Sequence, residues 1–235
     1  MIDFYGYGPG IFQGAIITIE VAILSLLIAF ILGLLGATAK LSDSRLAQGL
    51  AIAYTTLIRG VPDLVLMMLI FFGGQIAFNS FTEWLYYASD EKIDIFININ
   101  EFVAGIITIG FIFGAYMTET FRGAFLAVDK GQIEAAKAYG MNSRRIFVRI
   151  LFPQMMRYAL PGLGNNWQVL LKTTALVSII GLADMVRLAS EAAKSTGEPF
   201  LFLLPVALVY LTLTAISEWI FKRLKKRYNA GVAEA

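Results

Sequence analysis

The sequence contains no cysteine and no histidine among its 235 residues, and only 15% of its residues are charged. Without these two side chains, the chain cannot supply a disulfide framework, a zinc or haem site of the usual kind, a thiol nucleophile or a histidine base. The GxxxxGK[ST] pattern is also missing, so the chain has no phosphate-binding loop of that type. These absences exclude most classes of enzyme that depend on such groups.

Long apolar runs dominate what the sequence does contain. Hydrophobic residues make up 58% of the chain, which is typical of a protein that crosses a membrane several times. The first run is longer than the core of a secretory signal and follows Asp3 rather than basic residues, so we predict a retained span. Because a crossing needs about 20 residues, five transmembrane helices are expected. They lie at residues 11–37, 62–78, 102–120, 158–182 and 200–221.

The distribution of basic residues predicts the orientation of these spans. Lysine and arginine gather between spans one and two, between spans three and four, and after span five. On the opposite side there are only Lys92, Arg187 and Lys194, and five of the six charged residues in the segment 78–101 are acidic. Because cytoplasmic loops of membrane proteins are enriched in basic residues, we expect the N-terminus outside and the C-terminus in the cytoplasm; a bacterial inner membrane would make the outer side periplasmic.

Small residues in two of the spans predict close helix packing. The third span carries Gly110 and Gly114 in a GxxxG pair, extended by Thr118. The first span has small residues along one side, namely Ala22, Ala29, Gly33 and Gly36. Such residues let helix backbones approach each other in lipid. The contact could lie within one subunit or between two subunits.

A polar stretch, "EAAKAYGMNSRRIFVRILFP" at residues 134–153, lies on the predicted cytoplasmic side. A short helix is expected over residues 131–139, ended by Gly140 in the left-handed conformation. Either Asn142 or Ser143 can then cap a second helix that runs to Pro153. The first helix would present a surface of small residues to the cytosol, namely Ala135, Ala136 and Ala138. By its residues alone, the stretch could be an amphipathic connector at the membrane surface or a docking element.

The spacing of this stretch resembles the EAA loop of permease subunits in bacterial ABC importers. The family pattern is EAA, three residues, glycine, nine residues, and then I-x-L-P. This chain matches the pattern with one departure, which is Phe152 in place of the usual leucine. The resemblance implies that the loop couples the permease to a separate ATPase. The residues that would do so are Glu134, Ala135, Ala136, Gly140 and Pro153.

Other segments resemble the polar amino-acid branch of this family, and within it the Q-type subunits of histidine and lysine/arginine/ornithine importers. They are "YTTLIRGVPDLVL" (54–66), "GAYMTETFRGAF" (114–125), "RYALPGLGNNWQVLLKTTALVS" (157–178) and "KSTGEPF" (194–200). The resemblance implies one transmembrane permease domain over residues 1–235, with the all-α fold of type I importers, in the bacterial inner membrane.

The resemblance also implies the partners and the substrate class. The partners would be ATPase subunits, a second, non-identical permease subunit and a periplasmic substrate-binding protein, with no nucleic acid. The substrate would be a polar, basic amino acid such as histidine, arginine, lysine or ornithine; opines derived from arginine, or glutamine, are the alternatives. ATP and magnesium would be bound by the ATPase and no cofactor by this chain, which would not be an enzyme. A channel would not need the ATPase dock, and an intramembrane enzyme would need a nucleophile–base pair or a metal site.

Polar side chains inside the predicted spans are candidates for a substrate path. Asn165, Gln168 and Lys172 lie on one face of the fourth span, and a lysine near mid-membrane costs about 2.5–3.5 kcal/mol on insertion scales. They could line the path or form a structural lock to a neighbouring helix. In the third span, Glu119 could attract a cationic substrate or pair with Arg122 three residues later.

The outer segment at residues 183–197 is short, polar and compatible with a helix ended by Gly197 and Pro199. Under the resemblance, Arg187 and Glu191 are candidates for contact with the periplasmic binding protein. The alternative is a simple connector between two spans.

Overall fold

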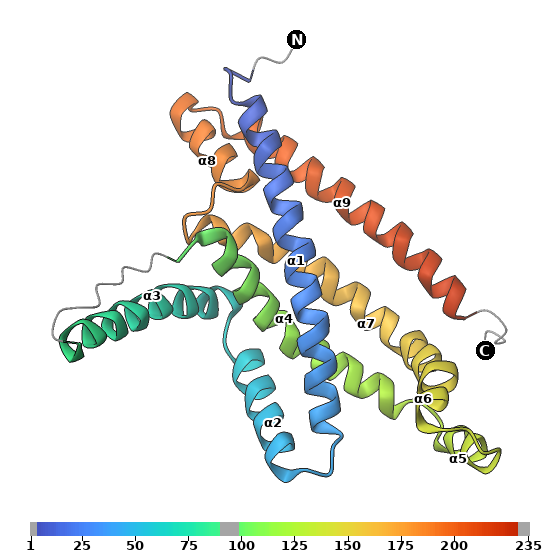
Figure 1. Cartoon of the computed structure of the whole chain (residues 1–235). Coiled ribbons are helices and arrows are strands. Elements are labelled where there is room, and N and C mark those ends of the chain that lie inside the picture. Colours follow the sequence, from blue (N-terminus) through green and yellow to red (C-terminus); the bar gives the residue numbers. More distant parts are fainter. Residues whose placement is uncertain (1–3, 90–98, 230–235) are drawn as a thin grey trace.

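The computed structural model describes residues 4–89 and 99–229, and in this part of the chain every regular element is helical (Figure 1). The all-α expectation is therefore confirmed for the described residues. The α-helices are α1 (Gly8–Lys40), α2 (Arg45–Gly60), α3 (Asp63–Ala88), α4 (Glu101–Leu126), α5 (Lys130–Ala138), α6 (Ser143–Ile146), α7 (Phe152–Thr173), α8 (Met185–Thr196) and α9 (Pro199–Tyr228). A π-helical turn (Phe147–Leu151) precedes α7, and a 3-10 helix (Thr174–Ser178) follows it.

Among the described residues, four helices are long and apolar enough to cross a membrane, namely α1, α3, α4 and α9. They contain the predicted spans at 11–37, 102–120 and 200–221, and the span at 62–78 begins one residue before α3. Helix α3 also runs ten residues further than predicted, to Ala88. It therefore occupies half of the acidic outer segment, whose residues 90–98 lie outside the described part.

The predicted span at 158–182 is not one continuous helix. Helix α7 ends at Thr173, and the chain turns through the 3-10 helix before Gly181, whose φ is +104°. The hydroxyl of Thr173 donates to the carbonyl of Val169 at 3.0 Å, and the hydroxyl of Thr174 donates to the carbonyl of Leu171. Because these side chains compete for helix carbonyls, the threonine pair provides a local reason for the end of α7.

Helix α2 occupies a segment that the sequence analysis treated only as a link between spans. Ser44 caps its N-terminus by accepting a hydrogen bond from the backbone N–H of Ala47. Its buried residues are Ala51, Thr55 and Ile58, whose spacing of four and three places them on one helix face. The helix packs through this narrow face against α1 and α4, whereas its other residues are more exposed.

The contact between α1 and α4 forms the centre of the bundle (Figure 1). A Cβ atom added to Gly33 would lie 2.6 Å from the Cβ of Met117, and one added to Gly110 would lie 2.7 Å from the Cβ of Ile28. At Gly114 the added atom would lie 2.8 Å from the Cβ of Leu32. The small residues therefore join two helices of the same chain, and the alternative of a contact between subunits is wrong for these faces.

Helix α3 diverges from the other long helices (Figure 1). Within α3 the buried residues are Leu66 and Met67, near its start, whereas large apolar side chains further along remain exposed. Among them are Phe72, Ile76 and Phe81. Most of α3 therefore has an apolar surface that the described residues of this chain leave uncovered.

The two ends of the described chain lie at opposite ends of the bundle. At the start of α1, the hydroxyls of Tyr7 and Ser195 in α8 are 2.9 Å apart. Near the end of α9, Lys225 lines one cavity with Leu160, which lies in the half of α7 that is nearer to α5 and α6. The elbow formed by α5 and α6 and the C-terminal part of α9 thus share one end of the molecule.

The α1–α4 contact predicts opposite outcomes for two glycine-to-alanine substitutions. Gly110→Ala should destabilise the purified protein by about 1–3 kcal/mol, because the new methyl group would collide with Ile28. Gly49→Ala, in α2, meets nothing within 4 Å and should be neutral or slightly stabilising because alanine favours helices. Thermal unfolding in detergent measures the stability of both variants. Equal unfolding temperatures for the two variants would contradict the assigned packing.

Candidate functional site

The elbow at residues 130–153 begins with a short, capped helix. The carboxylate of Asp129 accepts a hydrogen bond from the backbone N–H of Gly131 at 2.7 Å and so caps the start of α5. Gly140 follows the helix with a φ of +74°, as the sequence predicts. The backbone N–H of Gly140 donates to the carbonyl of Lys137, and that of Met141 donates to the carbonyl of Ala136. These bonds satisfy the last carbonyls of α5 and turn the chain sharply.

After the turn, the chain enters the second helix of the elbow. Of the two predicted caps, Asn142 is the one used, because its side-chain oxygen accepts a hydrogen bond from the backbone N–H of Arg145 at 2.9 Å. The expected end of this helix at Pro153 is wrong, because the chain passes through the π-helical turn directly into α7. A wider turn fits this place because Pro153 has no N–H to offer to the preceding carbonyls. The second helix of the elbow and α7 are thus one continuous run of helix.

The predicted surface of small residues is only partly exposed. Glu134, Ala135 and Ala138 are exposed, but Ala136 is 5% exposed and faces the second helix of the elbow. The expectation that Ala136 lies on the outer surface is therefore wrong. Tyr139 instead projects from the end of α5 with 89% of its surface exposed.

A cavity of about 400 Å³ separates α5 from the start of the following helices. It is lined by Gln132, Ala135, Ala136, Tyr139, Met141, Arg149, Ile150 and Gln154. The side-chain amide of Gln154 donates to that of Gln132 and bridges the two helical segments. The elbow therefore projects as a small knob with a hollow behind it.

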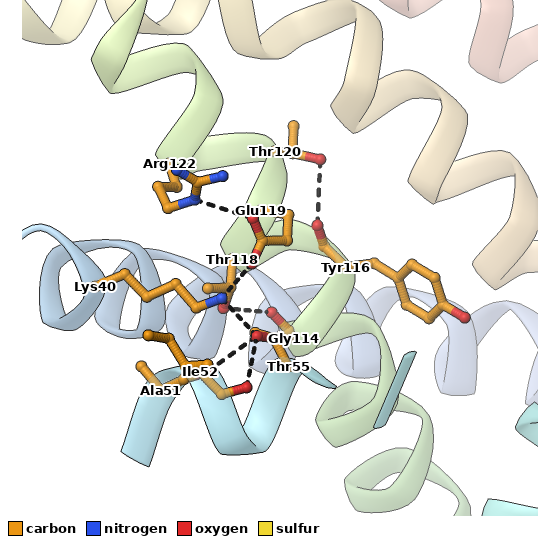
Figure 2. Close-up of polar contacts among 10 residues, drawn as sticks. All are labelled: Lys40, Ala51, Ile52, Thr55, Gly114, Tyr116, Thr118, Glu119, Thr120 and Arg122. Carbon is orange, nitrogen blue, oxygen red and sulfur yellow. Dashed lines mark hydrogen bonds and ion pairs between the residues drawn. The ribbon is translucent and has the colours of Figure 1, made fainter. Parts of the chain in front are cut away.

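Glu119 lies in a polar network at the same end of the bundle (Figure 2). The predicted pair with Arg122 is present, with the guanidinium Nε 3.0 Å from Oε2 of the carboxylate. The other carboxylate oxygen pairs with the ammonium of Lys40 at the end of α1, and this ammonium also donates to the hydroxyl of Thr55 in α2. The side chains of Lys40 and Glu119 are only 10% and 20% exposed. The network thus joins α1, α2 and α4, and both oxygens of Glu119 are engaged in it.

The sequence analysis missed Lys40 as a partner of Glu119. The two residues are 79 positions apart, and no spacing rule connects them. The sequence analysis uses Lys40 only as one of the basic residues between spans one and two that predict the orientation of the spans. The contact depends on how α1 crosses α4, which a single sequence does not reveal.

Consecutive residues of α7 contact two different helices. The side-chain amide of Asn166 donates to the hydroxyl of Thr120 in α4 at 3.0 Å, and the indole N–H of Trp167 donates to the hydroxyl of Ser217 in α9 at 2.7 Å. The side-chain amide of Gln168 donates to the carboxylate of Glu218 at 3.5 Å. Helix α7 is thus held between α4 and α9 by polar side chains.

Two of the three polar residues that were predicted to share one face of α7 line the same cavity. Asn165 and Gln168 line one cavity with Glu218 of α9, and the sequence analysis missed Glu218 although it interrupts an apolar run. Lys172 is exposed, does not line this cavity and forms no ion pair with the residues that the structure describes. A structural lock from Lys172 to a neighbouring helix is therefore not found within the described part of the chain.

Helix α8 occupies the outer segment that the sequence predicts as helical, and it ends at Gly197 with a φ of +75°. Arg187 and Glu191 pair with each other, the guanidinium Nε being 2.8 Å from Oε1 of the glutamate. Asp184 caps the helix through Oδ1, whereas its buried Oδ2 has no hydrogen-bond partner among the described residues. Burial raises the pKa of the Asp184 carboxyl above its ordinary value. A charged pair thus lies exposed on a helix that is fixed firmly at its start.

The family and the proteins that this chain resembles are all membrane components of transport systems. Residues 25–230 match the family described as the binding-protein-dependent transport system inner membrane component. The chain is 54% identical over 231 residues to the histidine/lysine/arginine/ornithine transport system permease protein HisQ of Escherichia coli, covering 98% of each chain. It is 40% identical over 227 residues to the octopine transport system permease protein OccQ of Rhizobium radiobacter, covering 97% of this chain and 93% of that protein.

A solved structure of a transporter has a similar fold. A chain from the crystal structure of an amino acid ABC transporter with histidines superposes with a TM-score of 0.78 at 30% identity. The match covers 97% of this chain and 99% of that chain. The resemblance stated from the sequence is therefore confirmed.

The network around Glu119 predicts a dependence between two substitutions. Glu119→Met alone should lower the free energy of unfolding by about 3–5 kcal/mol, because it leaves the buried ammonium of Lys40 without its partner. Lys40→Met combined with Glu119→Met should recover most of this loss, since both charges are then removed. Arg122→Met is the control and should cost at most about 1 kcal/mol, because its pair is more exposed. If the single Glu119 variant is as stable as the wild type, the buried pair is not a stabilising contact.

Proposed function

We propose that this chain, which belongs to the family of binding-protein-dependent transport system inner membrane components, imports basic amino acids as the permease subunit of an ATP-driven transporter. The protein is accordingly a multi-pass component of the inner membrane. The observation that carries the proposal is the elbow, whose helix, left-handed Gly140 and second helix follow the EAA spacing. The names of its relatives supply the substrate class, which is histidine, lysine, arginine and ornithine for the E. coli protein. Because another relative is an octopine permease, arginine-derived opines are the alternative substrates.

The proposed topology has five spans, with α7 as the fourth. Helix α7 has 22 residues and is about 33 Å long, which is sufficient to cross the hydrocarbon core. Its polar residues lower its hydropathy, but several of them are bonded to α4 and α9 rather than exposed to lipid. Five spans place the termini on opposite sides, and the basic residues near the elbow and after α9 favour a cytoplasmic C-terminus.

The elbow is proposed to dock on the ATPase subunit. Its exposed surface contains Glu134, Ala135 and the projecting Tyr139. Gly140 and Pro153 act differently, because they shape the turn and the entry into α7. Because the second helix of the elbow continues into α7 without a break, a movement of the ATPase would be transmitted through the elbow into the membrane. ATP and magnesium would be bound by that partner, and this chain would form no cofactor site and catalyse no bond chemistry.

The second permease subunit is proposed to cover α3. The aromatic and aliphatic side chains of α3 form an apolar surface that the described residues leave uncovered. A Cβ atom added to Gly73 or Gly74 would meet nothing within 4 Å. Small residues and exposed apolar side chains suit a helix–helix contact in the membrane. The two permeases would be similar but not identical, and the cavity between them would open alternately to each side.

The substrate path is proposed to run along the exposed polar face of α7. Asn165, Gln168 and Lys172 lie on this face, and Lys172 needs a water-filled or polar surrounding. Glu119 would support the path indirectly, because its carboxylate is engaged by Lys40 and Arg122. On the outer side, Arg187 and Glu191 of α8 would contact the periplasmic binding protein. Their charges form one exposed patch on a helix that packs against α1 and α9.

Gly140 provides a test of the coupling role. Gly140→Val should abolish most ATP-driven uptake while the spans still insert, because a β-branched residue resists a φ of +74°. Gly140→Asn is the matched control and should keep substantial uptake, because asparagine tolerates the left-handed conformation. Uptake and ATPase retention are measured with the complex in proteoliposomes. Normal uptake in the valine variant would refute docking through the elbow.

Lys172 provides a test of the path. Lys172→Met keeps the length of the side chain and removes its charge, so uptake per assembled complex should fall at least about tenfold while assembly is unchanged. Lys226→Met, on the exposed end of α9, is the control and should transport normally. Loss of assembly instead of uptake would assign Lys172 to a contact between subunits. Unchanged uptake and assembly would exclude both roles.

A further inference from the structure

A second cavity lies between α7 and α9, toward the end of the bundle that carries the elbow. Its volume is about 280 Å³, close to the lower limit for small-molecule sites. It is lined by Leu160, Pro161, Gly164, Asn165, Gln168, Glu218, Phe221, Lys222 and Lys225. The cavity therefore combines an apolar floor with amide, acidic and basic side chains. None of the roles assigned above uses its charged residues.

The charged residues of this cavity come from one face of α9. Glu218, Lys222 and Lys225 are spaced by four and three residues, which brings all three to the same side of the helix. A glutamate four residues before a lysine is the favourable arrangement for an ion pair within a helix. In the part of the chain that the structure describes, Glu218 nevertheless pairs with neither lysine and instead accepts the amide of Gln168. Both signs of charge are thus presented to the cavity.

The order of these charges along α9 determines which kind of ligand fits the cavity. Lys225 lies nearer to the C-terminal end of the helix, and its separation of seven positions from Glu218 corresponds to about 10 Å along the axis. A ligand that enters from the C-terminal end would meet the lysines first and the glutamate last. Phe221 lies between them along α9, and α7 adds Leu160 and Pro161 to the apolar lining. The cavity thus offers sites for an anionic group outside, a methylene stem in the middle and a cationic group inside.

We propose that this cavity binds an amino acid with a cationic side chain from the cytoplasmic side. The ammonium groups of Lys222 and Lys225 bind the α-carboxylate, and Glu218 binds the side-chain cation, with the amides of Asn165 and Gln168 beside it. The inference rests on the proposed function for its orientation and substrate class. It goes further by assigning an exit-side site to residues of α9. One negative and two positive charges leave the cavity with a net charge of +1, which keeps the affinity for a cationic amino acid low and favours release.

The headgroup of an anionic phospholipid is the competing occupant, because basic pockets on the cytoplasmic side of membrane helices can bind such lipids. Glu218 argues against it. The carboxylate lies closer to the membrane centre than either lysine, at a level where a phospholipid has ester groups and acyl chains. Neither part of the lipid offers a donor or a positive charge to a carboxylate. An amino acid with a basic side chain satisfies both ends of the cavity.

The test uses a single cysteine in a chain that otherwise has none. Pro161→Cys places a thiol at an exposed position of the cavity wall, and Lys226→Cys is the control outside the cavity. The assembled transporter in inside-out vesicles is labelled with a water-soluble thiol reagent in the presence of L-arginine, agmatine or L-citrulline. Agmatine lacks the carboxylate and citrulline lacks the side-chain charge. Arginine should slow labelling at position 161 but not at position 226, and each analogue should need a concentration about two- to fivefold higher.

Substitutions in the cavity then separate the two ends of the ligand. Glu218→Gln should remove the preference for arginine over citrulline, and Lys222→Met with Lys225→Met should remove the preference for arginine over agmatine. Persistence of both preferences, or equal protection at position 226, overturns the proposal. Labelling that follows the phosphatidylglycerol content of the vesicles and not arginine identifies a lipid site and also overturns it. ATP-driven uptake by the wild-type complex is measured in parallel, because its absence would refute the proposed function instead.

Discussion

The close approach of α1 and α4 is the contact on which the rest of the structure depends. In lipid there is no hydrophobic force to join helices, so van der Waals packing must do so. Gly33 and Gly110 allow it, because any added Cβ would collide with the facing helix. Ser25 adds a hydrogen bond from its hydroxyl to the carbonyl of Ile106 across the same contact. Helices α2, α3 and α7 pack against α4, α8 packs against α1, and α9 is attached to this pair through α7 and α8.

Helix α7 connects the elbow with the polar side chains that face α4 and α9. It begins directly after the π-helical turn, and its neighbours α4 and α9 hold it through the amide of Asn166 and the indole of Trp167. The elbow is thus not a loose loop between spans. Its position is tied through one helix to the face that carries Gln168 and Lys172. This continuity gives a physical basis for coupling an event outside the membrane to a change inside it.

The sequence predicts local features of this protein well and the contacts between distant segments poorly. Gly140 and Asn142 adopt their predicted roles because turn and cap preferences act over a few residues. The end of α7 at Thr173 was missed because apolar residues continue beyond it, and hydropathy does not register hydroxyl groups that bond helix carbonyls. The pair of Lys40 and Glu119 was missed for a different reason, since it depends on the crossing of two helices. Family resemblance supplied the function, which neither hydropathy nor charge distribution specifies.

The two kinds of interface in the bundle respond differently to force. In the α1–α4 contact, Met117 and Ile28 lie directly over Gly33 and Gly110, so sliding one helix along the other would push these side chains off the glycines and against larger residues. The contact between α7 and α9 depends on side-chain hydrogen bonds, such as that from Trp167 to Ser217. Side-chain hydrogen bonds can be exchanged for bonds to water in a hydrated cavity, whereas a backbone contact without Cβ atoms has no alternative partner. A displacement that enters through the elbow is therefore expected to open the boundary between α7 and α9 while α1 and α4 move as one unit.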